Sequence, residues 1–260
     1  MTGLESFFLG VVQGVTEFLP VSSSGHLVIF QTLFGIEGPA GLGFEVAVHL
    51  ATLVAILLVF RSRVVGLVSG VLRGDTASLA YVGKLALATL PAVVVALALS
   101  DWIEHTFANP DIAGACLLVT AVILWTTRAT LPAATGPEPG WLDAFWIGCA
   151  QACAILPGIS RSGTTVAVAL ALGVAPAAAA EFSFLLGTIA MAGAAVLILP
   201  GVAPGDLAAG PLLIGSGAAL VSGVGSIVLF LRLLAHRNFY VFSYYLVIAG
   251  AAFLAYVNWG

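Results

Sequence analysis

Two short polar segments, each inside a long apolar stretch, hold the residues of this chain that could do chemistry. The first reads Pro20-Val-Ser-Ser-Ser-Gly-His26, and the second reads Pro157-Gly-Ile-Ser-Arg-Ser-Gly-Thr-Thr165. The hydroxyl and imidazole groups of the first can act as nucleophiles or proton acceptors. Arg161 in the second is a planar donor suited to phosphate, and the flanking glycines let backbone N–H groups approach an anion. Together the segments are typical of phosphoryl transfer, in which charge spreads over the phosphoryl oxygens.

A carboxylate precedes the first segment. Gln13 and Glu17 are four residues apart, so both project from one face of the helix that leads into the segment. Glu17 can act as a base or hold a divalent cation. The full candidate site comprises Gln13, Glu17, Ser22, Ser23 and His26 from one half of the chain, and Ser160, Arg161, Ser162, Gly163 and Thr165 from the other.

Structural roles compete with these functional ones. A serine cluster in a membrane helix often bonds its own backbone or joins helices, His26 could cap a helix, and Glu17 could form a purely structural ion pair with Arg161. Their occurrence in two matched segments favours function. We interpret Glu181 as structural, whereas Glu45, which has His49 on the same helical face, fits either role.

Composition defines the class of protein. Of the 260 residues, 61% are hydrophobic and only 8% are charged, and the mean hydropathy is +1.14. Soluble domains carry about a quarter charged residues, so this is a membrane protein. Eight Lys and Arg against twelve Asp and Glu, with no run of like charge, exclude a basic surface for nucleic acid. The three cysteines lie in apolar segments and predict neither a disulfide framework nor a zinc site.

Apolar stretches long enough to cross a bilayer predict the fold class, an all-α integral membrane protein. Six such stretches cover residues 42–60, 84–100, 112–127, 180–199, 211–231 and 239–257. The interrupted stretches 4–33 and 142–172 are predicted as re-entrant segments, each a helix, a loop and a second helix. Non-helical backbone at membrane depth is tolerated only where protein or a water-filled cavity surrounds it.

Basic residues predict the orientation. Seven of the eight follow or begin the predicted spans on one side, and by the positive-inside rule that side is cytoplasmic and both termini lie outside. The eighth is Arg161, at membrane depth, where a charge is costly and indicates function.

The two interruptions are related by an internal repeat. Adding 138 to the positions of Gly10, Gln13, Ser22, Ser24 and Gly25 gives Gly148, Gln151, Ser160, Ser162 and Gly163. We predict one membrane domain, 1–260, made of repeats at about 1–130 and 140–260. Three full crossings in each repeat would insert the second repeat inverted relative to the first, which brings the two broken helices together near the bilayer midplane.

At these residues the sequence resembles the bacterial undecaprenyl-pyrophosphate phosphatases, membrane enzymes associated with bacitracin resistance. The stretch from Gln13 to His26 is similar to their first signature, 157–165 to their second, and Ala180-Glu-Phe-Ser-Phe184 also fits. The resemblance implies hydrolysis of a long-chain C55 isoprenyl pyrophosphate to the monophosphate carrier lipid, which recycles that lipid for cell-wall synthesis. It also implies the bacterial cytoplasmic (inner) membrane, a site facing the periplasm, and Mg²⁺ or Ca²⁺ with Glu17 as a ligand.

The resemblance assigns roles by position. Glu17 and Gln13 match the acidic pair, Ser22, Ser23 and His26 the catalytic loop, and Ser160, Arg161, Ser162 and Thr165 the phosphate-binding loop. Gln13 replaces the glutamate of some members. Leu246 follows Tyr245 where members often have an arginine, so no role is predicted there.

Three points stay open from the sequence. Ser23 could attack phosphorus while His26 takes its proton, or His26 could attack directly. A transporter or flippase of a phosphorylated isoprenoid lipid would use the same binding residues without a nucleophile. An ion channel or structural subunit would need neither the binding residues nor the nucleophile. The oligomeric state is undetermined, and a homodimer is one arrangement that the sequence permits.

Overall fold

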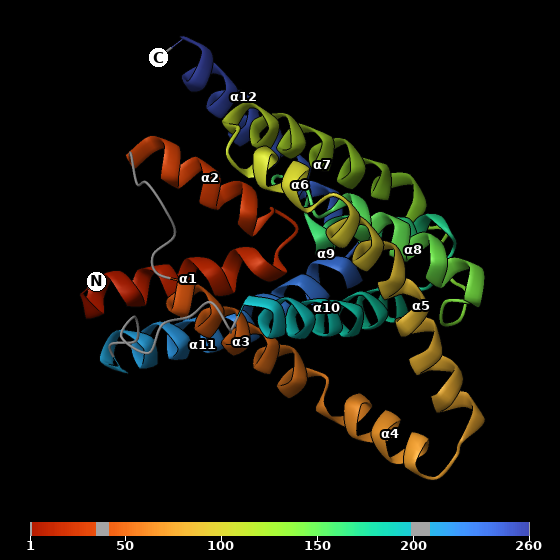
Figure 1. Ribbon diagram of the computed structural model, residues 1–260. Helices are drawn as coiled ribbons and strands as arrows, with labels where there is room; N and C mark the ends of the chain where they lie inside the picture. The colour runs from red at the N-terminus through yellow and green to blue at the C-terminus, as the bar shows by residue number, and fades with distance from the viewer. Residues whose placement is uncertain (1, 35–41, 199–208, 260) are drawn as a thin grey trace.

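The structure is a computed structural model that describes residues 2–34, 42–198 and 209–259, and in those ranges the chain is helical and contains no β-strand (Figure 1). The helices of the first half are α1 (Gly3–Phe18), α2 (Ser23–Phe34), α3 (Leu42–Val59), α4 (Arg61–Leu72), α5 (Thr76–Ala98), α6 (Ser100–Phe107) and α7 (Pro110–Thr130). Those of the second half are α8 (Trp141–Cys153), α9 (Arg161–Ala171), α10 (Pro176–Ile198), α11 (Ala209–Ala235), the 3₁₀ turn η2 (Phe239–Val241) and α12 (Phe242–Trp259).

The helices agree with a protein that crosses the membrane several times. Within the described ranges, α5, α7, α10, α11 and α12 are long and apolar enough to span a bilayer, and the bent pair of α3 and α4 brings the number to at most six. The predicted all-α integral membrane fold is confirmed. Both predicted interruptions are loops between two helices, α1 to α2 and α8 to α9.

Two spans begin earlier than the hydropathy indicated. Helix α5 begins at Thr76 rather than near residue 84, because the Asp75 carboxylate accepts the Ser78 backbone N–H at 2.9 Å and caps the helix. Helix α10 begins at Pro176 rather than residue 180, in keeping with the preference of proline for the first helical position. Asp75 and the polar residues of the first turn of α5 lie outside an apolar window, so hydropathy alone misses that turn.

Helix α4 was not predicted, and it turns by 80° from α3. Arg63 of α4 forms ion pairs with Glu138 and with Glu181, the latter at 2.8 Å, and its guanidinium lies over the Tyr81 ring at 4.4 Å. These contacts fix α4 against α5 and α10. They also agree with the structural role predicted for Glu181.

Helix pairing follows a matched pattern in the two halves. Helix α1 packs along α11, and α8 packs along α5, so the helix before each loop is supported by a long helix of the other half (Figure 1). Helices α7 and α12 lie side by side (Figure 1). This is the arrangement that a duplicated unit with exchanged partners would produce.

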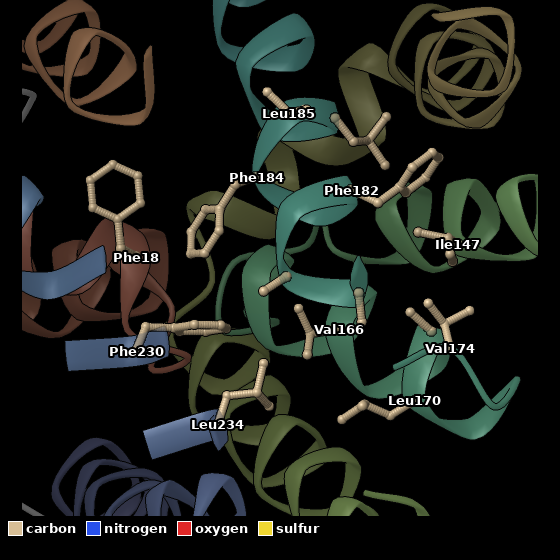
Figure 2. Packing of buried hydrophobic residues seen from close by; sticks show 14 of the residues in the cluster. Phe18, Ile147, Val166, Leu170, Val174, Phe182, Phe184, Leu185, Phe230 and Leu234 are labelled. Carbon is tan, nitrogen blue, oxygen red and sulfur yellow. The ribbon is translucent and has the colours of Figure 1, made fainter. Parts of the chain in front are cut away.

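Aromatic side chains form the part of the core that supports the site. Phe184 of α10 lies between Phe18 of α1 and Phe230 of α11, with ring centroids 5.8 Å and 5.0 Å apart, and all three are fully buried (Figure 2). Such edge-on pairs add packing energy beyond the area they bury. The contact fixes the end of α1, next to Glu17, against the middle of α10.

Candidate active site

The two loops touch each other through glycines. A Cβ atom on Gly25 would lie 2.8 Å from the Gly158 Cα, and one on Gly163 would lie 3.0 Å from the Pro20 Cβ. Positions 25 and 163, and positions 20 and 158, are each 138 residues apart, so the two contacts correspond under the repeat. A larger side chain at Gly25 would push the loops apart, whereas one at Gly158 would clash with Ala113 and Cys116 of α7.

Serine side chains cap the second helix of each segment with matching hydrogen bonds. The Ser22 hydroxyl accepts the Gly25 backbone N–H at 3.2 Å, and the Ser160 hydroxyl accepts the Gly163 N–H at the same distance. Ser22 also lies 3.3 Å from the Ser24 hydroxyl, as Ser160 lies 3.4 Å from that of Ser162. These caps satisfy backbone donors that would otherwise be unpaired at membrane depth.

The carboxylate of Glu17 joins the two loops. One oxygen accepts a hydrogen bond from Arg161 Nη2 at 2.9 Å, and the other accepts from the Ser23 hydroxyl at 2.9 Å and from Gln13 Nε2 at 3.2 Å. The Glu17 side chain is 9% exposed and that of Arg161 is 18% exposed. The i, i+4 geometry predicted for Gln13 and Glu17 is therefore present, and the predicted convergence of the two loops is confirmed.

The guanidinium of Arg161 rests on α10. Its Nη2 lies 3.6 Å from the Met191 sulfur. A Cβ atom on Gly187 would fall 1.5 Å from Nη1, so the absence of a side chain at Gly187 makes room for the guanidinium. The sequence did not indicate a role for Gly187, because glycines are common in membrane helices. Its role follows only from the Arg161 guanidinium that packs against it.

A cavity of about 970 Å³ lies beside the ion pair. Five of the predicted residues line it, namely Glu17, Ser22, Ser23, Ser160 and Arg161. Glu45 and His49 of α3 line it as well, so the residue that could have had either role is part of the site. Gln13 lines an adjoining cavity of about 270 Å³, whose walls are largely apolar.

Four predicted residues lie outside the lining of both cavities: His26, Ser162, Gly163 and Thr165. The Ser162 hydroxyl donates to the Phe18 carbonyl at 3.1 Å, and the Thr165 hydroxyl donates to the Arg161 carbonyl at 2.7 Å. The Ser162 hydroxyl therefore ties the loop to the end of α1, and the Thr165 hydroxyl, which also lies 2.5 Å from the Ser183 hydroxyl, ties α9 to α10. Gly163 serves the cap already described.

His26 is 7% exposed and both of its ring nitrogens have partners. Nδ1 lies 2.8 Å from the Ser22 carbonyl oxygen, and Nε2 lies 2.5 Å from the Tyr245 hydroxyl. Sequence reasoning assigned nothing to Tyr245. The contact joins residues 219 positions apart, and no local pattern could have shown it.

Thr120 is a further residue that the sequence did not indicate. Its hydroxyl donates to the Gly158 carbonyl at 2.8 Å and accepts the Ser160 backbone N–H at 3.1 Å. One side chain thus satisfies both a donor and an acceptor of the second loop. It does so from α7, a helix that looks like an ordinary apolar span.

The donors around the main cavity suit an anionic phosphate group. Arg161 offers paired N–H donors, serine hydroxyls lie on two sides, and the Ser23 hydroxyl already points at a carboxylate that can take its proton. In the described residues no group of three His, Cys, Asp or Glu side chains could by itself hold a metal ion. A hydroxyl, a base and a guanidinium around one cavity can transfer a phosphoryl group.

Replacement of Gly187 by alanine should weaken phosphate binding without unfolding the protein. The added methyl group would displace the guanidinium of Arg161, and we expect affinity for inorganic pyrophosphate to fall about tenfold, the order of one charge-assisted hydrogen bond. Isothermal titration calorimetry of the purified protein with inorganic pyrophosphate measures this affinity. Gly193→Ala is the matched control, because nothing lies within 4 Å of its added Cβ on the same helix. Equal affinity in the two variants would contradict the prediction.

The chain is similar to known proteins over nearly its whole length. The family model described as "Bacitracin resistance protein BacA" matches residues 6–252. Proteins named undecaprenyl-diphosphatase are similar over nearly their whole length. That of Desulfosudis oleivorans is 41% identical, covering 98% of each chain, and that of Geobacter metallireducens is 39% identical, covering 99% of each. On this match, which extends over both loops and all the helices that hold them, the chain belongs to the BacA family of bacitracin resistance proteins.

Proposed function

We propose that this chain hydrolyses undecaprenyl diphosphate to undecaprenyl phosphate and inorganic phosphate, and so recycles the carrier lipid for cell-wall synthesis. The observation that carries the proposal is the Glu17 carboxylate, which binds the Ser23 hydroxyl with one oxygen and Arg161 with the other beside one cavity. The names of the relatives support the substrate. A transporter would need the arginine but would have no use for a serine hydroxyl hydrogen-bonded to a base.

The hydrogen bonds favour Ser23 as the nucleophile. Its oxygen attacks the terminal phosphorus, its proton passes to Glu17, and the bond to the bridging oxygen breaks to release undecaprenyl phosphate. Water then cleaves the phosphoserine, releases phosphate and restores the hydroxyl. The alternative in which His26 attacks has less support, because both ring nitrogens are engaged and the ring does not line the cavity.

The ion pair couples proton transfer to charge stabilisation. Glu17 and Arg161 neutralise each other before substrate arrives. When Glu17 takes the proton of Ser23 it loses its charge, and the guanidinium becomes available to the phosphoryl oxygens, where negative charge develops. Arg161 therefore binds most strongly when the transition state forms.

A divalent cation, Mg²⁺ or Ca²⁺, completes the proposal. Mg²⁺ in enzymes is commonly held by one or two carboxylates together with substrate phosphates rather than by a closed protein cage. Glu17 and Glu45 supply carboxylates to the same cavity, which fits that mode of binding. The ion would neutralise charge on the pyrophosphate.

The adjoining apolar cavity suits the start of the isoprenyl chain. It shares Thr16, Ser23 and Ser24 with the main cavity, and its other walls include Val12, Leu27 and Val48. Pyrophosphate bound at Ser23 would therefore place the first isoprene units against aliphatic side chains.

The positive-inside distribution supports both termini outside the cytoplasm, in the inner membrane of a bacterium. We also propose that the active site faces the periplasm and that the two repeats are inverted.

Ser23→Ala should lower kcat for phosphate release from undecaprenyl diphosphate by about 10³-fold or more, because the nucleophile is lost. Purified protein in detergent with the C55 substrate gives the measurement. Thr32→Ala is the control, since that hydroxyl lies on the same helix as Ser23, donates to the Val28 carbonyl and lines neither cavity. A wild-type protein that moves the lipid across vesicles but releases no phosphate would establish the flippase instead.

Chelation should stop the reaction. With EDTA we expect phosphate release to fall to background and to return on addition of Mg²⁺ or Ca²⁺, because the pyrophosphate charge is then neutralised again. Activity that survives chelation would remove the cation from the mechanism.

Leu27→Trp should narrow the apolar cavity. Leu27 is 37% exposed and lines the apolar cavity but not the main cavity. We therefore expect KM for the C55 substrate to rise about tenfold, with little change for a short, water-soluble prenyl pyrophosphate. Leu4→Trp, on the exposed face of α1, is the control. An equal change in KM for both substrates would argue against a chain-binding role.

A further inference from the structure

We infer that His26 and Tyr245 are positioning residues, which hold the backbone corner at Ser22 so that the Ser23 hydroxyl faces Glu17. His26 acts through Ser22, and Tyr245 acts through His26. The inference rests on the proposed function for its kinetic test, but the contacts themselves are independent of it.

The corner at Ser22 is strained. Ser22 has φ +68°, in the left-handed region that residues other than glycine rarely occupy. Such a conformation is unfavourable and persists only where surrounding contacts enforce it. The residue after the corner is Ser23, whose direction the corner sets.

His26 supplies one of those contacts. Its Nδ1 lies 2.8 Å from the Ser22 carbonyl oxygen, and the backbone N–H of His26 donates to the same oxygen at 3.1 Å. A carbonyl can only accept, so Nδ1 carries the proton and Nε2 presents a lone pair. The imidazole is therefore a donor that fixes the carbonyl of the strained residue.

Tyr245 fixes the imidazole in turn. Its hydroxyl can donate to Nε2 across 2.5 Å, and the two rings are stacked at 5.7 Å with an angle of 10°. Tyr245 belongs to α12, in the second half of the chain, so the last helix determines the ring orientation and the tautomer of a residue in the first loop.

The second loop shows what happens where this support is absent. Ser160, which corresponds to Ser22, has an ordinary φ of −73°. Thr164 corresponds to His26, and its buried hydroxyl has no hydrogen-bond partner. The two loops share their serine caps, yet the strained corner occurs only in the loop that carries the imidazole and the nucleophile. The histidine thus occurs in the loop whose serine has the strained backbone conformation.

The kinetic test uses side chains that keep one contact at a time. Asparagine at position 26 places an amide donor near the Nδ1 position, toward Ser22, whereas glutamine places its amide near Nε2, toward Tyr245. We expect His26→Asn to keep kcat within about tenfold of wild type. His26→Gln and His26→Ala should lose about 100-fold, the order expected for a misplaced nucleophile. If asparagine were as inactive as alanine, a donor toward Ser22 would not be enough for activity and the inference would be overturned.

Tyr245→Phe keeps the stacked ring and removes only the hydroxyl. We expect kcat to fall about 5- to 20-fold with KM within twofold, and we expect no further fall when the same change is made in His26→Ala. Tyr244→Phe is the matched control, because its ring packs on Trp125. A Tyr245→Phe variant with wild-type kcat, or with the same loss in both backgrounds, would refute the coupling.

A spectroscopic readout separates this inference from the proposed function. With ¹⁵N-labelled histidine, the four histidines of the chain give four pairs of ring resonances. Tyr245→Phe should shift the Nε2 resonance of His26, identified by its loss in His26→Asn, and leave the other three in place. An unmoved resonance would refute the contact. A wild-type chain that releases no phosphate would instead refute the proposed function and leave this result standing.

Discussion

The ion pair between Glu17 and Arg161 is the interaction on which the site depends. A charge at membrane depth is costly unless it is paired and hydrogen-bonded. Here the carboxylate accepts from the guanidinium with one oxygen and from Ser23 and Gln13 with the other. The pair comes from opposite halves of the chain, so the two loops must meet before either charge is compensated. Stability and function therefore require the same convergence.

Broken helices inside an apolar protein need partners for their backbone groups, because lipid offers none. The loops meet this requirement with side chains that the sequence already carries, since Ser22 and Ser160 cap the helices that follow. Thr120 satisfies both a carbonyl and an N–H of the second loop. Most of the hydroxyls that look catalytic in the sequence thus hold the loops in place. The Ser23 hydroxyl, which bonds Glu17, is the exception.

The reactive groups lie at positions that correspond between the two loops but carry different side chains. The positions of Ser23 and Glu17 correspond to those of Arg161 and Ile155, and all four residues line the cavity. One scaffold therefore presents a hydroxyl and a carboxylate, the proposed nucleophile and base, from one side, and a guanidinium and an apolar wall from the other. Symmetric loops would have given two nucleophiles without a cation, or two cations without a nucleophile.

The sequence alone predicts the helical membrane class, the two interruptions and the cavity residues Glu17, Ser23 and Arg161, because polar and helix-breaking residues are costly in lipid and are kept only where protein or a cavity supports them. It also determined the spacing of Gln13 and Glu17, which depends only on helix geometry. The other features of the site depend on how the helices pack. The contact of His26 with Tyr245 joins residues 219 positions apart. The space that Gly187 leaves for Arg161 likewise depends on how α9 and α10 pack. Local patterns fix which groups are present, but only packing fixes which of them touch.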